Sequence, residues 1–111
     1  MSKNSITILN RIDKDGNPSG GSAYGKGLTV QFQRGPLGRG DDRKEPNGAF
    51  VDDLLVVAKR RLDFYQGASE GRFSCAENAE AISHIQKALE ALERRTARRE
   101  EAGIEGTHQG N

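Results

Sequence analysis

The sequence predicts an α+β fold in which a small antiparallel β-sheet is followed by a two-helix antiparallel hairpin, assembled into an oligomer. Two short segments with alternating apolar residues open the chain, and two longer segments with helical periodicity follow them. The 111 residues are only 33% hydrophobic and include no Trp. Such a chain buries only a thin core, so we expect a single domain over residues 1–111 that covers its apolar surface by oligomerising.

The N-terminal part, residues 5–33, is predicted to be a β-hairpin with a glycine-rich loop. Residues 5–12 (SITILNRI) and 28–33 (LTVQFQ) are rich in β-branched side chains and alternate in character, which is typical of strands. Between them, residues 13–27 hold turn-forming residues and glycines, which predict a mobile loop. Two prolines and many charges break residues 34–48, so this segment is predicted to be a connection.

Residues 49–103 are predicted to form the helical hairpin. Apolar residues recur at three- or four-residue spacing through residues 49–66, and Asn47 is available as an N-cap. Residues 66–73 (QGASEGRF) are short and contain two glycines, which favours an antiparallel connection to a second helix.

The second helix is predicted to begin with Ser74 and Glu77, which match the S-x-x-E capping box. It is predicted to end at Gly103, where a left-handed residue is needed, and residues 104–111 form a tail. A narrow apolar seam, typical of a helix that packs on another helix, runs along it: Ile82, Ile85, Leu89, Leu92 and Thr96.

Beside the seam, a stripe of small and apolar residues continues into Arg95 and Arg99. A desolvated guanidinium needs a partner, and its planar fork binds phosphate in a bidentate manner, so these arginines are candidate ligand-binding residues. The alternation of arginine with glutamate here is equally typical of an ordinary salt-bridged helix surface. Asn78 lies on the same side, roughly 25 Å from Arg95, so one small molecule reaches both only between two antiparallel chains.

Composition and spacing argue against several classes of function. The net charge of +1 predicts no duplex nucleic acid or membrane as a partner. The single cysteine excludes an internal disulfide framework, and neither a signal peptide nor a membrane span is recognisable, so we expect a cytoplasmic protein. No nucleophile, base and oxyanion donor can be assembled, and no cluster has metal-ligand spacing. We therefore expect no enzyme activity, no cofactor and no metal.

Two motifs carry weaker chemical signals. Residues 20–27 (GGSAYGKG) nearly match a phosphate-binding P-loop, but Gly27 replaces the required Ser or Thr and the segment leads into a predicted strand. Cys75 lies in the first predicted turn of the second helix, where the helix dipole favours a reactive thiolate, although a small, partly buried residue is the commoner interpretation.

Over residues 28–108 the chain resembles the first family of phage Thoeris anti-defence proteins. The resemblance lies in GPLGRGDDRKEPNGAFVDDLL, FYQ, SCAENAEAISHIQKALEAL and RRTARREEAGIEGTH. Its most specific parts are the E-N-A of residues 77–79 and the R-T-x-x-R-x-x-x-G-x-E-G-T-H of residues 95–108. The helical hairpin of that family is similar to that of phage anti-CBASS sponge proteins.

The resemblance implies a sponge that sequesters cyclic nucleotide immune signals without cleaving them, in the cytoplasm of an infected bacterium. It implies cyclic ADP-ribose isomers such as gcADPR as ligands, cyclic di- or trinucleotides as further ones, and a dimer or hexamer. The ligand-contacting residues that it implies are Asn78, Arg95, an aromatic base-stacking residue at Phe64 or Tyr65, and a second pocket at Gly106, Thr107 and His108. The alternatives are a structural or regulatory hairpin protein that only oligomerises, and, more remotely, a phosphodiesterase.

Overall fold

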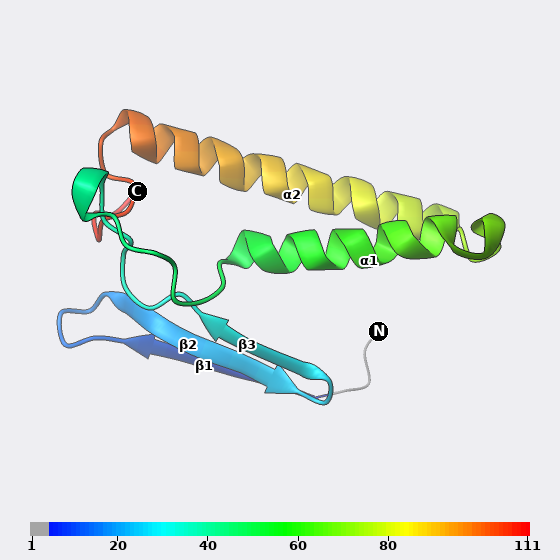
Figure 1. Ribbon diagram of the computed structural model, residues 1–111, viewed down its shortest axis with the longest axis horizontal. Coiled ribbons are helices and arrows are strands. Elements are labelled where there is room, and N and C mark those ends of the chain that lie inside the picture. The colour runs from blue at the N-terminus through cyan, green and yellow to red at the C-terminus, as the bar shows by residue number, and fades with distance from the viewer. Residues whose placement is uncertain (1–4) are drawn as a thin grey trace. The chain divides into compact units, whose positions relative to one another are not determined.

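The computed structural model describes residues 5–111, which form three strands, one 3₁₀ turn and two helices (Figure 1). The chain divides into two compact units. Among the described residues, one contains the sheet and comprises residues 5–50 together with Ala102–Asn111. The other is the helical hairpin, Val51–Glu101. The antiparallel sheet followed by two helices confirms the predicted α+β class.

The sheet has three antiparallel strands in the order β1 (Ile6–Ile12), β2 (Pro18–Gly25) and β3 (Leu28–Phe32). The prediction of strands at both ends of this region is confirmed. The prediction of a mobile glycine-rich loop between them is wrong, because most of that segment is the central strand β2. The Lys26–Gly27 turn does lead into a strand rather than a helix, as expected for a failed P-loop match.

Glycine makes β2 possible as a central strand. Gly21 has φ +143° and pairs with Asn10 of β1 and Phe32 of β3. A Cβ atom at Gly21 would lie 2.1 Å from the carbonyl oxygen of Leu9, so only glycine allows this close approach. Backbone hydrogen bonds to both neighbouring strands therefore stabilise β2 in place of side-chain contacts. In the sequence alone, the same glycines are typical only of turns.

The two faces of the sheet differ in character. Ala23 and Val30 lie opposite each other on one face and are buried, with exposed fractions of 6% and 8%. Ser22 and Gln31 are paired on the other face, which we call the polar face although Leu9 of β1, the partner of Ser22, lies on it too. A register irregularity between Asn10 and Ile12 interrupts the pairing of β1 with β2 at the end of this polar face.

The segment after β3 is an ordered connection. The Asn47 side chain accepts a hydrogen bond from the Arg34 N–H (2.8 Å) and donates one to the Arg34 carbonyl (3.1 Å). Asn47 therefore does not cap a helix, and the predicted N-cap is wrong, because the first helix begins at Val51. The 3₁₀ turn η1 (Gly40–Asp42) follows Leu37, which is buried.

The helices are α1 (Val51–Gly71) and α2 (Ala76–Glu101). Ala68, Ser69 and Glu70 have non-helical dihedrals, so regular α1 ends at Gly67, close to the predicted end. The predicted capping box is wrong: the Ser74 hydroxyl donates to the Gly71 carbonyl at 2.8 Å instead of capping α2.

Of the remaining predictions for α2, only that of its C-terminal end agrees with the structure. The prediction that Cys75 lies in the first turn of α2 is wrong, because α2 begins at Ala76. The Cys75 sulfur instead accepts a contact of 3.4 Å from the Asn78 N–H just before the helix. Gly103 has φ +74°, which confirms the predicted left-handed residue after α2. No residue of α1 or α2 is buried, and neither helix is long and apolar enough to cross a membrane.

Candidate functional site

The predicted site residues fall into two sets. Five of them lie on the helical hairpin: Phe64, Tyr65, Asn78, Arg95 and Arg99. Three lie on the C-terminal segment of the sheet unit: Gly106, Thr107 and His108. Each set is described by itself.

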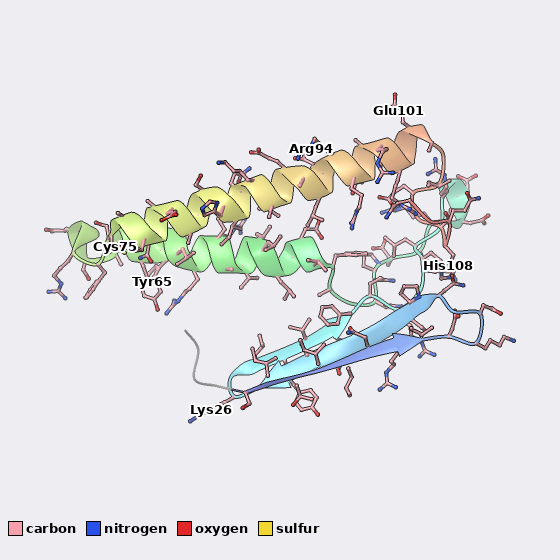
Figure 2. The ribbon with its side chains drawn as sticks, turned by 180° about the vertical axis from the view of Figure 1, so that it is seen from behind. Lys26, Tyr65, Cys75, Arg94, Glu101 and His108 are labelled. Atoms are coloured by element: carbon pink, nitrogen blue, oxygen red, sulfur yellow. The ribbon has the colours of Figure 1, made fainter. Side chains whose placement is uncertain are left out.

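Two exposed aromatic rings mark the end of the hairpin where α1 and α2 are joined. The ring centroids of Phe64 and Tyr65 are 5.9 Å apart at an interplanar angle of 63°, an edge-to-face pair. The two residues are 56% and 39% exposed, which leaves ring surface open to a ligand. Figure 2 shows Tyr65 and Cys75 at the same end of the hairpin.

Arg61 organises these rings, and sequence reasoning missed it. Its guanidinium carbon lies 5.1 Å from the Phe64 centroid and 4.8 Å from the Tyr65 centroid, and Nη2 contacts the Tyr65 hydroxyl at 3.1 Å. One cation therefore bridges both rings. The signal in the sequence is the spacing of three and four residues from Arg61, which places all three side chains on one face of a helix.

Gln66 closes the joined end of the hairpin and was also not predicted. Its side-chain oxygen accepts from the Cys75 N–H at 3.0 Å, and its side-chain nitrogen donates to the Cys75 carbonyl at 3.2 Å. Asn78 follows in the first turn of α2 and is half-buried. The structure thus brings Phe64, Tyr65 and Asn78 to one end of the hairpin.

Arg95 and Arg99 lie in the other half of α2. The seventeen residues from Asn78 to Arg95 correspond to roughly 25 Å of helix, so one chain does not bring these two together. Figure 2 shows the neighbouring Arg94 and Glu101 toward that end. Arg99 is half-buried but Arg95 is exposed. The expected desolvation of Arg95 does not occur within one chain, and arises only where a second surface covers it.

A groove of about 550 Å³ runs along the same half of α2. Seam residues and three acidic side chains take part in its lining; the lining residues are Asp52, Gln86, Leu89, Leu92, Glu93, Thr96, Ala97 and Glu100. The seam residues Leu89 and Leu92 are only half-buried. The predicted seam therefore exists, and α1 does not seal it.

The C-terminal set lies against the connection after β3. Gly38 donates its N–H to the Gly106 carbonyl at 2.9 Å, and Arg39 donates to the Glu105 carbonyl at 2.9 Å. Gly106 has φ +81°, and a Cβ there would lie 2.4 Å from the Gly38 carbonyl oxygen. Gly106 is thus required by backbone packing.

Thr107 turns the chain after Gly106. Its hydroxyl donates to the Ile104 carbonyl and accepts from the Gln109 N–H at 3.2 Å, while His108 is exposed. These contacts give the segment a defined turn, which the sequence analysis treated as a tail.

The remaining candidate reactive side chains, a thiol and an imidazole, lie apart from each other on the hairpin. Cys75 is an exposed free thiol, and His84 lies on an exposed face at 3.5 Å from Glu80. Within residues 5–111, no group of three or more His, Cys, Asp and Glu side chains has a geometry that could hold a metal ion.

Comparison with known proteins places the chain beside a protein family and a phage protein. The profile of the "Acb2/Tad1, hairpin domain" family matches residues 27–97, which include Phe64, Tyr65, Asn78 and Arg95. The chain is 41% identical over 85 residues to "Thoeris anti-defense 1" of Bacillus phage SBSphiJ7. This alignment covers 77% of the chain and 55% of the relative, so the chain spans about half the length of that protein.

Proposed function

The chain belongs to the Acb2/Tad1 hairpin-domain family, and we propose that it is a phage anti-defence sponge that sequesters cyclic nucleotide immune signals. Cyclic ADP-ribose isomers such as gcADPR are the proposed ligands. The protein binds them without cleavage in the cytoplasm of the infected host. The anti-defence role is also that named for the Bacillus phage relative.

The proposal depends on one observation: groups suited to a base lie at one end of the hairpin, and groups suited to a phosphate lie toward its other end. The joined end offers the exposed Phe64 and Tyr65 rings and the Asn78 amide, which suit the stacking and edge recognition of a base. The distal half of α2 offers Arg95, whose guanidinium suits a phosphate. A cyclic nucleotide presents both kinds of group close together.

Oligomerisation is the step that joins the two ends. Two antiparallel hairpins packed along the half-buried Leu89 and Leu92 seam place Asn78 of one chain near Arg95 of the other. The same packing desolvates Arg95 and strengthens its interaction with a phosphate. We therefore propose an inter-subunit pocket in a dimer or a larger assembly, with Arg99 beside it.

Gly106, Thr107 and His108 are proposed to line a second pocket, for cyclic di- or trinucleotides. The Gly106 backbone is fixed by its contact with Gly38, which gives the segment the rigidity that a binding loop requires. The exposed His108 ring is then the group available to a ligand.

The decisive experiment separates sequestration from cleavage and from mere assembly. Purified protein is incubated with gcADPR, freed of unbound ligand, heated, and the released nucleotide is analysed by mass spectrometry. A sponge returns the intact cyclic molecule in stoichiometric amount. Accumulation of a linear product identifies a phosphodiesterase. No uptake of any cyclic nucleotide in a panel identifies a hairpin protein that only oligomerises, which the unsealed groove on α2 also accommodates.

A further inference from the structure

We propose that the polar face of the sheet carries a separate binding site for a phosphate-bearing anion, at the irregularity between β1 and β2. All of its residues belong to the sheet unit, whereas Asn78 and Arg95 belong to the hairpin. The site therefore goes beyond the sponge function proposed above and stands independently of it.

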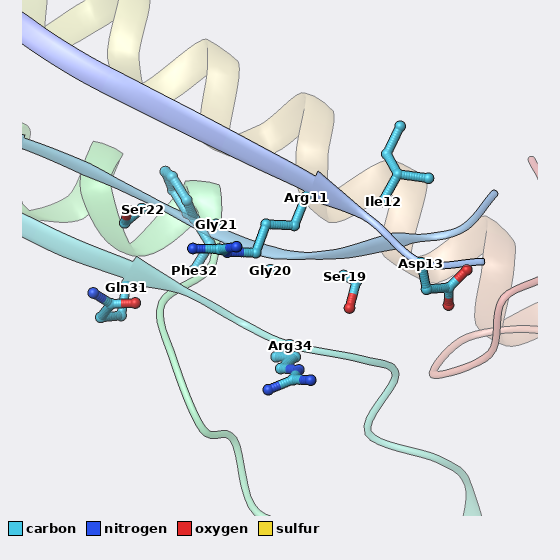
Figure 3. A pocket seen from close by; sticks show the side chains of 10 residues that line it. All are labelled: Arg11, Ile12, Asp13, Ser19, Gly20, Gly21, Ser22, Gln31, Phe32 and Arg34. Carbon is cyan, nitrogen blue, oxygen red and sulfur yellow. The ribbon is translucent and has the colours of Figure 1, made fainter. Parts of the chain in front are cut away.

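A depression of about 710 Å³ lies on this part of the sheet (Figure 3). Three strands and the segment after β3 contribute to it; the lining residues include Arg11, Asp13, Ser19, Gly20, Ser22, Gln31 and Arg34. In Figure 3 the Arg11 side chain extends across β2 at Gly20 and Gly21, and Arg34 lies just beyond the end of β3.

The irregular register gives Arg11 its position. Asn10 pairs with Gly21 and Ile12 pairs with Pro18, so Arg11 alone opposes two residues of β2. Such a bulge changes the direction of a side chain relative to a regular ladder. Gly20, one of the two opposed residues, has φ +76° and no side chain to fill the space in front of Arg11.

Gly20 also makes room for the second arginine. A Cβ atom at Gly20 would lie 3.3 Å from the Arg34 Cβ, so Arg34 stands directly beside the glycine on the side of β3. Arg11 of β1 and Arg34, just after β3, thus flank β2, and strands two places apart in a sheet are about 10 Å apart. Two guanidinium groups across this distance fit a diphosphate better than a single charge.

The charges of the two arginines are not neutralised within the described chain. Neither guanidinium has an ion pair or hydrogen bond in residues 5–111. The one carboxylate of the depression, Asp13, is occupied in its own turn, where Oδ1 accepts from the N–H groups of Asp15 (2.9 Å) and Asn17 (3.0 Å). Those bonds leave Asp13 charged, so two arginines against one carboxylate give the depression a net positive charge.

Neutral hydrogen-bonding groups complete the site. The Ser22 hydroxyl and the Gln31 amide are paired neighbours on the polar face, and Ser19 lies opposite Arg11. None of these three side chains makes a hydrogen bond within residues 5–111. Two cations with free hydroxyl and amide groups are the chemistry that binds phosphate esters, as in a nucleoside diphosphate, or free pyrophosphate.

The site is tested by titrating ¹⁵N-labelled full-length protein with inorganic pyrophosphate and, separately, with ADP. We expect saturable shifts of the Gly20, Gly21 and Ser22 amide signals. Arg11→Gln and Arg34→Gln are each expected to weaken binding roughly tenfold, and the double variant to abolish saturation. Arg43→Gln is the matched control, because Arg43 is an exposed arginine of the same unit that does not line the depression.

The two titrations distinguish the sources of the phosphate. Tighter binding of ADP than of pyrophosphate assigns a nucleotide as the ligand, and equal binding assigns the free anion. Shifts that grow linearly without saturation, or that persist in the double variant, overturn the proposal. Repeating the titration with Arg95→Ala separates this site from the hairpin pocket: the shifts must remain, and their loss would assign them to the hairpin and reject a site on the sheet.

Discussion

Gln66 stabilises the joined end of the hairpin through two side-chain hydrogen bonds to the Cys75 backbone. We expect Gln66→Ala to lower the free energy of unfolding by about 1–2 kcal/mol, since each bond contributes about 0.5–1.5 kcal/mol and this end is partly exposed. Urea denaturation followed by far-UV circular dichroism measures the change. Asp63→Ala, which removes only an exposed contact with Lys59, is the control and should change stability by less than about 0.5 kcal/mol. Equal effects would contradict the role of Gln66.

A comparison of Gly106 with Gly103 distinguishes two reasons for glycine: a lack of space for a side chain and a left-handed backbone. Both have positive φ, +81° and +74°, so alanine at either position adopts a strained left-handed backbone that costs about 1–2 kcal/mol. Only at Gly106 does the new Cβ also collide with the Gly38 carbonyl, whereas nothing lies within 4 Å of it at Gly103. Gly106→Ala should therefore lower the melting temperature several degrees more than Gly103→Ala does. Similar melting temperatures for the two variants would show that the Gly38 contact is not required.

From the sequence, residues of the hairpin site could be placed only by their positions along the predicted helices. Periodicity puts Phe64 and Tyr65 near the end of one helix and Asn78 near the start of the next, and the structure agrees. The contact of Gln66 with Cys75 depends on the path of the connection between the helices, which no periodic pattern encodes. Ser74 illustrates the same limit, because its hydroxyl bonds to Gly71 instead of capping α2.

At the scale of elements, the helices were predictable and the central strand was not. The three- and four-residue spacing of apolar side chains defines α2 and its seam, and the left-handed Gly103 marks its end. Strand β2 (PSGGSAYG) lacks the β-branched residues by which strands are recognised. Its pairing on both sides arises from contacts between distant residues, such as Gly21 against Leu9, which local sequence does not reveal.

The seam of α2 should behave as an interface element. Leu89 is half-buried and lines the groove, so Leu89→Asp places a charge where a second helix is expected. We expect self-association to weaken at least roughly hundredfold, corresponding to about 3 kcal/mol, or the hairpin to unfold. Light scattering measures the mass and circular dichroism the helicity. Ala91→Asp, on an exposed face of the same helix, is the control. A monomeric wild-type protein at micromolar concentration would refute the interface altogether.

At the scale of the whole molecule, the distribution of buried residues argues for assembly. Within residues 5–111 the buried apolar side chains are Ala23, Val30 and Leu37, all in the sheet unit. The hairpin contains none, although it includes two long helices with apolar side chains. Helices in folded proteins obtain most of their stability from packing of an apolar face, so a hairpin without a buried residue requires a further surface.

That further surface also decides whether the ligand pocket is shared between chains. In a two-fold dimer of antiparallel hairpins, each pocket takes Asn78 from one chain and Arg95 from the other. Arg95→Ala should cost about 1.5–3 kcal/mol of ligand binding and Asn78→Ala about 1 kcal/mol, since a bond to a charged group is stronger than a neutral one. After subunit exchange, each mixed dimer holds one pocket with both substitutions and one with neither, so about a quarter of all pockets regain wild-type affinity. Isothermal titration of the mixture with gcADPR measures this fraction.

The control is an Arg94→Ala protein, altered at the exposed neighbouring position, which should bind the ligand normally by itself. When it is mixed with the Arg95→Ala protein, the number of tight sites should equal the number that the Arg94→Ala protein contributes. If the mixture of Asn78→Ala and Arg95→Ala proteins regains no tight sites after exchange is confirmed by native mass spectrometry, the two residues do not build one pocket across chains.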